Sequence, residues 1–364
     1  MAISESRTVT VKTARKSILR AFSKQRPVFL WGAPGVGKSD LIASIAEELG
    51  GALIDVRLAT CEPTDIRGIP ILDKNTNKMI WAEPAELPSE EFCKKYPIVV
   101  LFLDELSACP SSLQVAAYQL ILNRRIGTYK LPDNVVVIAA GNRDSDKGVS
   151  YRMSSALANR FIHLTMTVSA DDWIEWAVQN KVHKDVVGFI SFAKQDLYDF
   201  DPRSSGHAFA TPRSWHFVSQ LLEDGDDETN MDLISGTIGE GMAMKFMAHR
   251  RISGDMPAAA DILSGKVTEL KIKEISAMYS LTVSMLYELK DNYDVAKKED
   301  DMSKWYPQGN HFIKFILDNF TTELAVMGAR MAMATYKLPF SATNMPSMTT
   351  FTKKYSKYII LANS

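Results

Sequence analysis

The sequence predicts an α/β fold in which a parallel sheet carries helices on both faces, followed by a mostly helical part. Three observations support this prediction. Short apolar runs alternate with helical patterns over roughly the first 165 residues, a glycine-rich loop joins the first run to a helix, and beyond about residue 170 the pattern is mostly helical. Strands separated by helices indicate βαβ units and therefore parallel pairing.

The predicted elements follow in chain order. Strands are expected at 28–31, 52–58, 98–103, 135–140 and 161–165, and helices at 13–22, 39–49 and 113–122. The run 98–103 (IVVLFL) is apolar on both faces, as a central parallel strand should be. Two segments interrupt the alternation and predict β-hairpins, at about 68–81 and 125–132. A long apolar helix is expected at 312–333.

Composition limits the class of protein. The 42 basic and 43 acidic residues give a net charge of −1, which argues against a surface built entirely for nucleic acid. The three cysteines, Cys61, Cys93 and Cys109, form no C-x-x-C pair and suit a reducing compartment. The N-terminus has no apolar signal core, and no stretch approaches the length of a membrane span. We therefore expect a cytoplasmic protein with no membrane contact, or one in the host cytoplasm if it is viral.

The strongest motif is a phosphate-binding loop between the first strand and its helix. It matches G-x-x-x-x-G-K-[ST] and consists of Gly32, Ala33, Pro34, Gly35, Val36, Gly37, Lys38 and Ser39. The glycines let backbone N–H groups approach phosphate oxygens, and the helix directs its positive end at them. Lys38 is expected to reach the β- and γ-phosphates, and the Ser39 hydroxyl to coordinate Mg²⁺. Asp40, next in the helix, completes the predicted nucleotide-binding set.

An acidic pair, Asp104 and Glu105, directly follows the buried run 98–103. Ligands of parallel sheets bind at the carboxyl ends of the strands, so the pair should face the phosphate-binding loop. Asp104 is expected to hold Mg²⁺ through water, and Glu105 to orient and deprotonate an attacking water molecule. The alternative is an acidic cap on the helix that follows.

Three more polar residues are candidates, each with a simpler alternative. Asn142 follows the run 135–140 and could lie between a γ-phosphate and the attacking water, or could be a turn residue. Arg160 precedes the last predicted strand, and Arg213 opens a helical pattern. A lone arginine is more often a solvated surface charge. No spacing rule favours either arginine.

The order of these motifs resembles the AAA+ ATPases, and within them the MoxR-type branch of the helix-2-insert group. Gly32–Ser39 is similar to the Walker A motif of a P-loop NTPase core, and Leu101–Glu105 is similar to its Walker B motif. Asn142 matches the sensor-1 position, Arg160 the arginine finger and Arg213 sensor 2. The hairpins at 68–81 and 125–132 fall at the helix-2 insert and the pre-sensor-1 hairpin. The resemblance covers about residues 10–290.

This resemblance implies a domain organisation and an activity. The expected parts are a nucleotide-binding α/β domain at 1–210, a helical lid at 211–295 and a C-terminal helical extension at 296–364. The implied reaction is hydrolysis of ATP with Mg²⁺, with Glu105, Asn142, Arg160 and Arg213 as catalytic residues. The implied assembly is a homo-oligomeric ring, usually hexameric. The implied task is chaperone-like remodelling of a protein client, often with a partner that carries a von Willebrand factor A domain.

A DNA-acting motor of restriction, replication or packaging is the alternative. Its support is the basic pair Arg124-Arg125 at the base of the second hairpin, which could face a ring pore. The other basic pairs are scattered and lack interleaved aromatic residues, so nucleic acid is the less favoured partner. The hairpin tips, near Asn75 and Tyr129, are expected to contact the client, because exposed loops commonly carry recognition.

Overall fold

The computed structural model describes residues 7–75, 77–146, 151, 153–203, 206–224 and 227–360. The chain forms two compact units, one of Met1–Ser169 with Asp201–Ser204, the other of Ala170–Phe200 with Ser205–Ser364. The boundaries predicted near residues 210 and 295 remain predictions about domain organisation. In the structure the border between the units lies between Ser169 and Ala170, and the helical part forms one unit.

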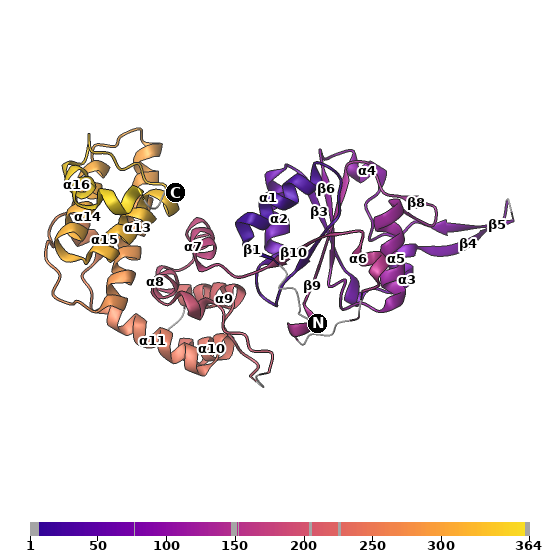
Figure 1. The fold of residues 1–364 in the computed structure, drawn as a ribbon, viewed down its shortest axis with the longest axis horizontal. Coiled ribbons are helices and arrows are strands. Elements are labelled where there is room, and N and C mark those ends of the chain that lie inside the picture. The colour runs from indigo at the N-terminus through magenta and orange to yellow at the C-terminus, as the bar shows by residue number, and fades with distance from the viewer. Residues whose placement is uncertain are drawn as a thin grey trace. The chain divides into compact units, whose positions relative to one another are not determined.

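The first unit is built on a six-stranded sheet in the order β1-β10-β2-β9-β6-β3, with every neighbouring pair parallel (Figure 1). The strands are β1 (Thr8–Val9), β2 (Val28–Trp31), β3 (Ala52–Arg57), β6 (Val99–Asp104), β9 (Val135–Gly141) and β10 (Ile162–Met166). β6 and β9 are almost entirely buried because helices cover both faces of the sheet. The predicted fold class is confirmed.

Two layers of helices bury the two faces of this sheet. The helices α1 (Val11–Phe22) and α2 (Lys38–Glu48) pack on the face that carries Val28 and Leu30. The opposite face carries Phe29, Leu101 and Leu103. It is covered by α3 (Pro63–Arg67), α4 (Glu90–Cys93), α5 (Ser111–Asn123) and α6 (Ser155–Ala158). Alternate residues of one strand therefore contribute to different cores, as a pleated strand requires.

Both predicted hairpins form. β4 (Ile69–Asp73) pairs with β5 (Lys78–Ala82) in an antiparallel ribbon, and β7 (Arg125–Ile126) pairs with β8 (Tyr129–Lys130). Gly68 precedes the ribbon with φ +84°, and a Cβ atom there would overlap the carbonyl oxygen of Ala82. Only glycine fits at this entry to the ribbon, because both the backbone angle and the close approach exclude a side chain.

Two features differ from the sequence prediction. Strand β1 was not predicted, because two residues are too short to show a hydrophobic period. The single helix expected at 312–333 is wrong: α14 ends at Asn319 and α15 begins at Thr322. The Asn319 side chain accepts a hydrogen bond from the backbone of Leu270 and donates to the carbonyl of Thr268. Phe320 has an extended backbone, so the helix ends there. The apolar sequence pattern nevertheless continues across this break.

The second unit is helical within its described residues. Its helices are α7 (Ala170–Gln179), α8 (Lys184–Phe192), α9 (Pro212–Asp224), α10 (Asp227–Ile238), α11 (Glu240–Gly254), α12 (Ala259–Leu263), α13 (Ile275–Lys298), α14 (Trp305–Asn319), α15 (Thr322–Arg330) and α16 (Pro346–Ile360). Helix α13 contributes eleven buried residues and forms the core with α14, α15 and α16. Among the helices of the described ranges, none combines the length and apolarity needed to cross a bilayer.

One buried histidine lies where α8, α11 and α13 meet. His249 is 5% exposed, and its Nε2 lies 2.6 Å from the Ser280 Oγ. Its Nδ1 is buried with no partner in the part of the chain that the structure describes. Burial lowers the pKa of His249 from 6.5 to about 4, although the nearby Asp185 carboxylate acts in the opposite direction. The neutral ring is therefore the form that fits the fold.

We predict that this histidine makes the second unit sensitive to acid. The folded pKa lies below the unfolded one, so its stabilising contribution is complete above pH 6.5 and is lost as the pH falls toward 4. The loss in free energy of unfolding is about 3 kcal/mol at most. Urea unfolding at several pH values should show the wild-type advantage over His249→Gln shrinking on acidification. Exposed His207→Gln should follow the wild type. A constant difference between wild type and His249→Gln would contradict the assignment.

Candidate active site

The glycine-rich loop connects the end of β2 to the start of α2. Strand β2 ends at Trp31, and α2 begins at Lys38 with Gly37 as its N-cap residue. Gly37 has φ +84°, a left-handed conformation that glycine adopts without cost. No side chain caps this helix, so its first N–H groups can donate to an anion. The loop has the local geometry that phosphate binding requires.

The Lys38 ammonium joins this loop to a second strand. Its Nζ donates to the carbonyl oxygens of Gly32 at 2.7 Å and Ala33 at 3.2 Å, and to the Asn142 Oδ1 at 3.2 Å. Asn142 directly follows β9, which pairs with β2. From sequence alone Asn142 could have been only a turn residue. The structure places its amide beside the lysine of the phosphate-binding loop.

The acidic pair ends strand β6, at the same edge of the sheet. Asp104 is half-buried and Glu105 is exposed. The N-cap position of α5 is occupied by Pro110, so neither carboxylate caps that helix and the alternative of an acidic cap is wrong. Glu105 has φ +57°, an unusual backbone conformation for a residue other than glycine. Its N–H donates to the Asp104 Oδ1 at 2.9 Å. Such strain commonly marks a side chain directed toward a function.

A third carboxylate, which the sequence did not predict, belongs to this edge. Asp55 lies on β3, the neighbour of β6, where Arg57 pairs with Asp104. Burial raises the pKa of Asp55, the negative charge of Asp104 raises it further, and Arg57 lowers it. Asp55 and Asp104 therefore share one electrostatic environment. The sequence offered one signal for Asp55. Side chains alternate between the two faces of a strand, so residues 55 and 57 of β3 lie on the same face.

Close packing fixes the end of β9. A Cβ atom on Gly141 would overlap the Ser107 Oγ and lie 3.0 Å from Phe29 Cζ. The Ser107 hydroxyl donates to the Asn142 carbonyl oxygen at 3.3 Å. A role for Ser107 was not predicted from the sequence. Gly141 leaves room for β9 to approach Ser107, and the Ser107 hydroxyl binds the Asn142 carbonyl oxygen. Both residues therefore hold Asn142 in place.

The donor groups at this edge suit magnesium. Mg²⁺ prefers hard oxygen ligands and keeps several waters, taking one or two protein groups together with phosphate oxygens. The Ser39 hydroxyl and the Asp104 carboxylate are donors of this kind, at the start of α2 and the end of β6. Within the described ranges, no group of three or more His, Cys, Asp or Glu residues forms a closed metal site. The residues fit a metal that arrives with the nucleotide.

Arg160 lies at the opposite edge of the sheet. It follows α6 and precedes β10, whose first residue Ile162 pairs with Val28 at the start of β2. The phosphate-binding loop lies beyond the other end of β2, about 13 Å along the strand at ~3.3 Å per residue. The Arg160 Nε is buried and has no hydrogen-bond partner among the described residues. The length of β2 therefore separates Arg160 from the phosphate-binding loop of the same chain.

Arg213 belongs to the second unit. It lies in the first turn of α9 and is exposed. Thr211 and Ser214 cap this turn reciprocally, since each backbone N–H donates to the other residue's hydroxyl, at 2.7 and 3.1 Å. The capped turn orients Arg213 with respect to its own unit. Its role at a phosphate remains a prediction.

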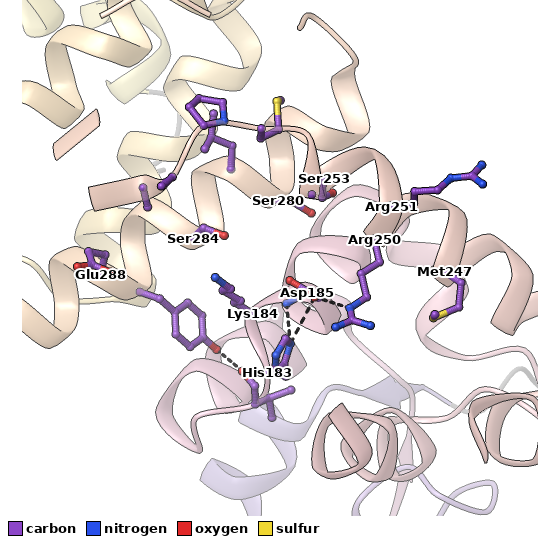
Figure 2. A pocket seen from close by; sticks show the side chains of 18 of the residues that line it. His183, Lys184, Asp185, Met247, Arg250, Arg251, Ser253, Ser280, Ser284 and Glu288 are labelled. Atoms are coloured by element: carbon purple, nitrogen blue, oxygen red, sulfur yellow. Dashed lines mark hydrogen bonds and ion pairs between the residues drawn. The ribbon is translucent and has the colours of Figure 1, made fainter. Parts of the chain in front are cut away.

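The second unit contains a cavity of about 1500 Å³ (Figure 2). In Figure 2 the Arg250 Nε pairs with the Asp185 carboxylate at 2.8 Å, and the side chain of Lys184 lies nearby. The lining also includes His183, whose pKa is lowered chiefly by burial. None of the residues that the sequence predicts for phosphate chemistry lines this cavity. It is therefore separate from the site formed by Lys38, Asp104 and Asn142.

Parts of this chain are similar to known proteins. Residues 28–165 match the model of the AAA family, "ATPase family associated with various cellular activities". Midasin from Giardia intestinalis is 27% identical over 179 residues, which are 47% of this chain and only 4% of midasin. Among solved structures, a Thermotoga maritima RuvB mutant is 17% identical with a TM-score of 0.39, covering 71% of this chain and 79% of RuvB. NtrX from Brucella abortus is 15% identical with a TM-score of 0.34, covering 79% of this chain and 62% of NtrX.

The matched segment begins at the first residue of β2 and ends within β10. It therefore includes the phosphate-binding loop, the acidic pair, Asn142 and Arg160. Residues 28–165 are therefore the part of this chain that is similar to AAA ATPase-family domains.

Proposed function

We propose that this protein hydrolyses ATP with Mg²⁺ and uses the energy to remodel or activate a protein client, as a MoxR-type AAA+ ATPase. The observation that carries the proposal is the contact of 3.2 Å between the Lys38 Nζ and the Asn142 Oδ1. It joins the phosphate-binding loop to the amide that follows β9, at the edge where β6 ends in Asp104. Phosphate, metal and attacking water would therefore meet one set of groups.

Each group has a distinct role in this proposal. The loop N–H groups and Lys38 bind the phosphates, and Ser39 and Asp104 hold the metal, which screens phosphate charge when bound. Glu105 takes the proton of the attacking water, which adds to the γ-phosphorus as the bond to ADP breaks. The exposed position of Glu105 supports this role, because the carboxylate can reach a water molecule above the sheet edge. Asn142 orients that water with its amide.

The position of Arg160 supports action on a neighbouring subunit. An arginine at the N-terminal edge of the sheet cannot reach phosphates at the carboxyl edge of its own subunit. In a closed head-to-tail ring, each subunit would supply one arginine to the next site. Six subunits are the usual number for related proteins, and we propose the same here. Arg213, at the capped start of α9, is proposed to contact the nucleotide as sensor 2.

The β4–β5 ribbon is the proposed contact for the protein client. Ile71 pairs with Ile80 and Leu72 with Met79, and all four are 46–60% exposed. Neighbouring pairs point to opposite faces, so both faces of the ribbon present apolar side chains to solvent. Its base is held where the Arg67 guanidinium stacks on Trp81, 4.5 Å from the ring centre. An anchored ribbon with an exposed apolar end is suited to bind another polypeptide.

The second hairpin is less suited to contact a client than its sequence suggested. Tyr129 is 4% exposed, and its hydroxyl donates to the Pro88 carbonyl at 2.7 Å. The expectation that Tyr129 lies at an exposed tip is therefore wrong. Arg124 is also engaged, since it donates to the carbonyl oxygens of Pro132 and Val135 at 2.7 and 2.9 Å. This weakens the alternative of a DNA-acting motor, which depended on a free Arg124-Arg125 pair.

Replacing Lys38 tests the site as a whole. Lys38→Ala should abolish tight ATP binding because no other described side chain brings a positive charge to both Gly32 and Asn142. Binding of a fluorescent ATP analogue, measured by titration, gives the comparison. Exposed Lys24→Ala is the matched control and should bind like the wild type. Equal affinity of Lys38→Ala and the wild type would overturn the assignment of the phosphate-binding loop.

Replacing Glu105 separates binding from turnover. Glu105→Gln should keep ATP affinity and lower the hydrolysis rate about 10²- to 10⁴-fold, since the amide can orient the water but cannot accept its proton. Phosphate release and nucleotide titration measure the two effects independently. The expected product is an ATP-loaded assembly. A variant that hydrolyses at the wild-type rate would require a different base, with Asp55 as the next carboxylate to examine.

Mixed assemblies test whether Arg160 acts across an interface. Arg160→Ala should slow hydrolysis by about 10³- to 10⁵-fold, as for other arginine fingers. Mixing Arg160→Ala with Lys38→Ala subunits should restore part of the activity, because an intact loop from one then meets an intact arginine from the other. Assembly is verified by light scattering before each assay. Full activity of an isolated monomer would exclude the role in trans.

The ribbon is tested with a photo-crosslinking amino acid at Met79. In cells, with Glu105→Gln to hold the ATP-loaded form, position 79 should give adducts to a second polypeptide. Val115, which is 68% exposed on α5, is the control position and should not give them. Leu72→Thr with Ile80→Thr should abolish the adducts and leave basal hydrolysis intact, since threonine keeps strand propensity. Adducts only between copies of this chain would contradict the proposed client contact.

A further inference from the structure

An aromatic cluster lies between the phosphate-binding loop and Arg160. It consists of Phe29, Trp31, Phe161 and His163, with Phe29 4.2 Å from Trp31 and 5.4 Å from Phe161 between ring centres. The indole of Trp31 and the imidazole of His163 are stacked at 6.1 Å. Phe29 pairs with His163 in the sheet, so these side chains share the face opposite α1 and α2.

Two directional hydrogen bonds run through the histidine. The Trp31 Nε1 donates to the His163 Nδ1 at 2.9 Å, and the His163 Nε2 lies 2.8 Å from the Ala158 carbonyl oxygen. An indole N–H is a donor only, so the Nδ1 must be the acceptor and the proton of the neutral ring must be on Nε2. The Nε2–H then donates to Ala158. The two bonds fix one tautomer and one ring orientation.

The two ends of this chain of bonds have different neighbours. Trp31 is bonded directly to Gly32, whose carbonyl oxygen accepts from the Lys38 Nζ at 2.7 Å. Ala158 is the last residue of α6, two positions before Arg160. The Arg160 N–H donates to the Leu157 carbonyl, and the Phe161 N–H donates to Ala158. A displacement of the Ala158 carbonyl would therefore move the backbone that carries Arg160.

We propose that Trp31 and His163 are positioning residues that couple the phosphate-binding loop of one subunit to the Arg160 that the same subunit presents to its neighbour. The proposal rests on the proposed function of Arg160 in trans. The sheet separates the loop from Arg160 by the length of β2, and the Trp31–His163–Ala158 chain spans that length through side chains. Movement of the loop around phosphates thereby reaches the next active site.

The simpler explanation is that the cluster only stabilises the sheet. Aromatic packing alone would do this, and it needs neither the indole N–H nor the imidazole N–H. The coupling depends on both hydrogen bonds. Trp31→Phe keeps an aromatic ring and removes the N–H donor. His163→Leu removes both hydrogen bonds that the histidine makes, to Trp31 and to Ala158. His163→Gln retains an acceptor and a donor, so it is the conservative variant.

The test assigns each variant to a complementation group. In assembled rings, His163→Leu and Trp31→Phe should lower kcat at least tenfold, with nucleotide Kd within twofold of the wild type. His163→Gln should recover part of the rate. Mixing His163→Leu with Glu105→Gln subunits should restore part of the activity, because Glu105→Gln subunits still bind ATP and carry an intact Trp31, His163 and Arg160, whereas mixing with Arg160→Ala should not. In an Arg160→Ala background, His163→Leu should cause no further loss.

Several outcomes would overturn the coupling. An additional loss from His163→Leu in the Arg160→Ala background would show that His163 does not act through Arg160. A weakened nucleotide Kd would place the defect in the loop itself, and a lowered Tm in both His163→Leu and His163→Gln would leave only a structural role. Unchanged kcat in His163→Leu and Trp31→Phe would also refute it. If Arg160→Ala itself leaves turnover of assembled rings intact, the arginine finger fails, which is a separate result.

Discussion

The parallel register of β2, β9 and β6 is the constraint on which the site depends. Trp31 pairs with Gly141 and Leu103 with Ala139, so Gly32, Asn142 and Asp104 leave the sheet at one edge. The strands themselves are buried and apolar, which makes them a rigid base for the polar groups at their ends. The same register places Arg160 at the other edge, before β10 begins. One pairing pattern therefore determines which groups can act together within one chain.

Several local departures from regular structure lie at this edge. Gly37 and Glu105 both have positive φ, and Gly141 approaches Ser107 and Phe29 too closely for a side chain. Elsewhere in the first unit the strands pair without interruption, and their side chains fill two cores in alternation. The regular part of the sheet holds the strained residues in position. This division is expected when a rigid scaffold supports a site built from loops.

Much of this unit could be predicted because its signals are local. The β2 range and the glycine-rich loop follow from hydrophobic runs and a motif with defined spacing. Asp55 and Ser107 were missed because their importance depends on pairing between distant segments. Tyr129 was placed at an exposed tip because a hairpin pattern does not show that its hydroxyl will find Pro88. The break after Asn319 depends on its bonds to Thr268 and Leu270, about 50 residues earlier, so no local period could reveal it.

The backbone at Glu105 has a consequence for how the protein would change under selection. A left-handed conformation costs a residue with a Cβ about 1 kcal/mol or more, and glycine there costs far less. Losing the carboxylate is therefore compatible with a gain in folding stability. Under the proposed role of Glu105 as the base, lineages in which turnover is no longer needed would accumulate glycine or asparagine at this position. A catalytically silent homologue with a more heat-resistant α/β unit is the expected evolutionary product.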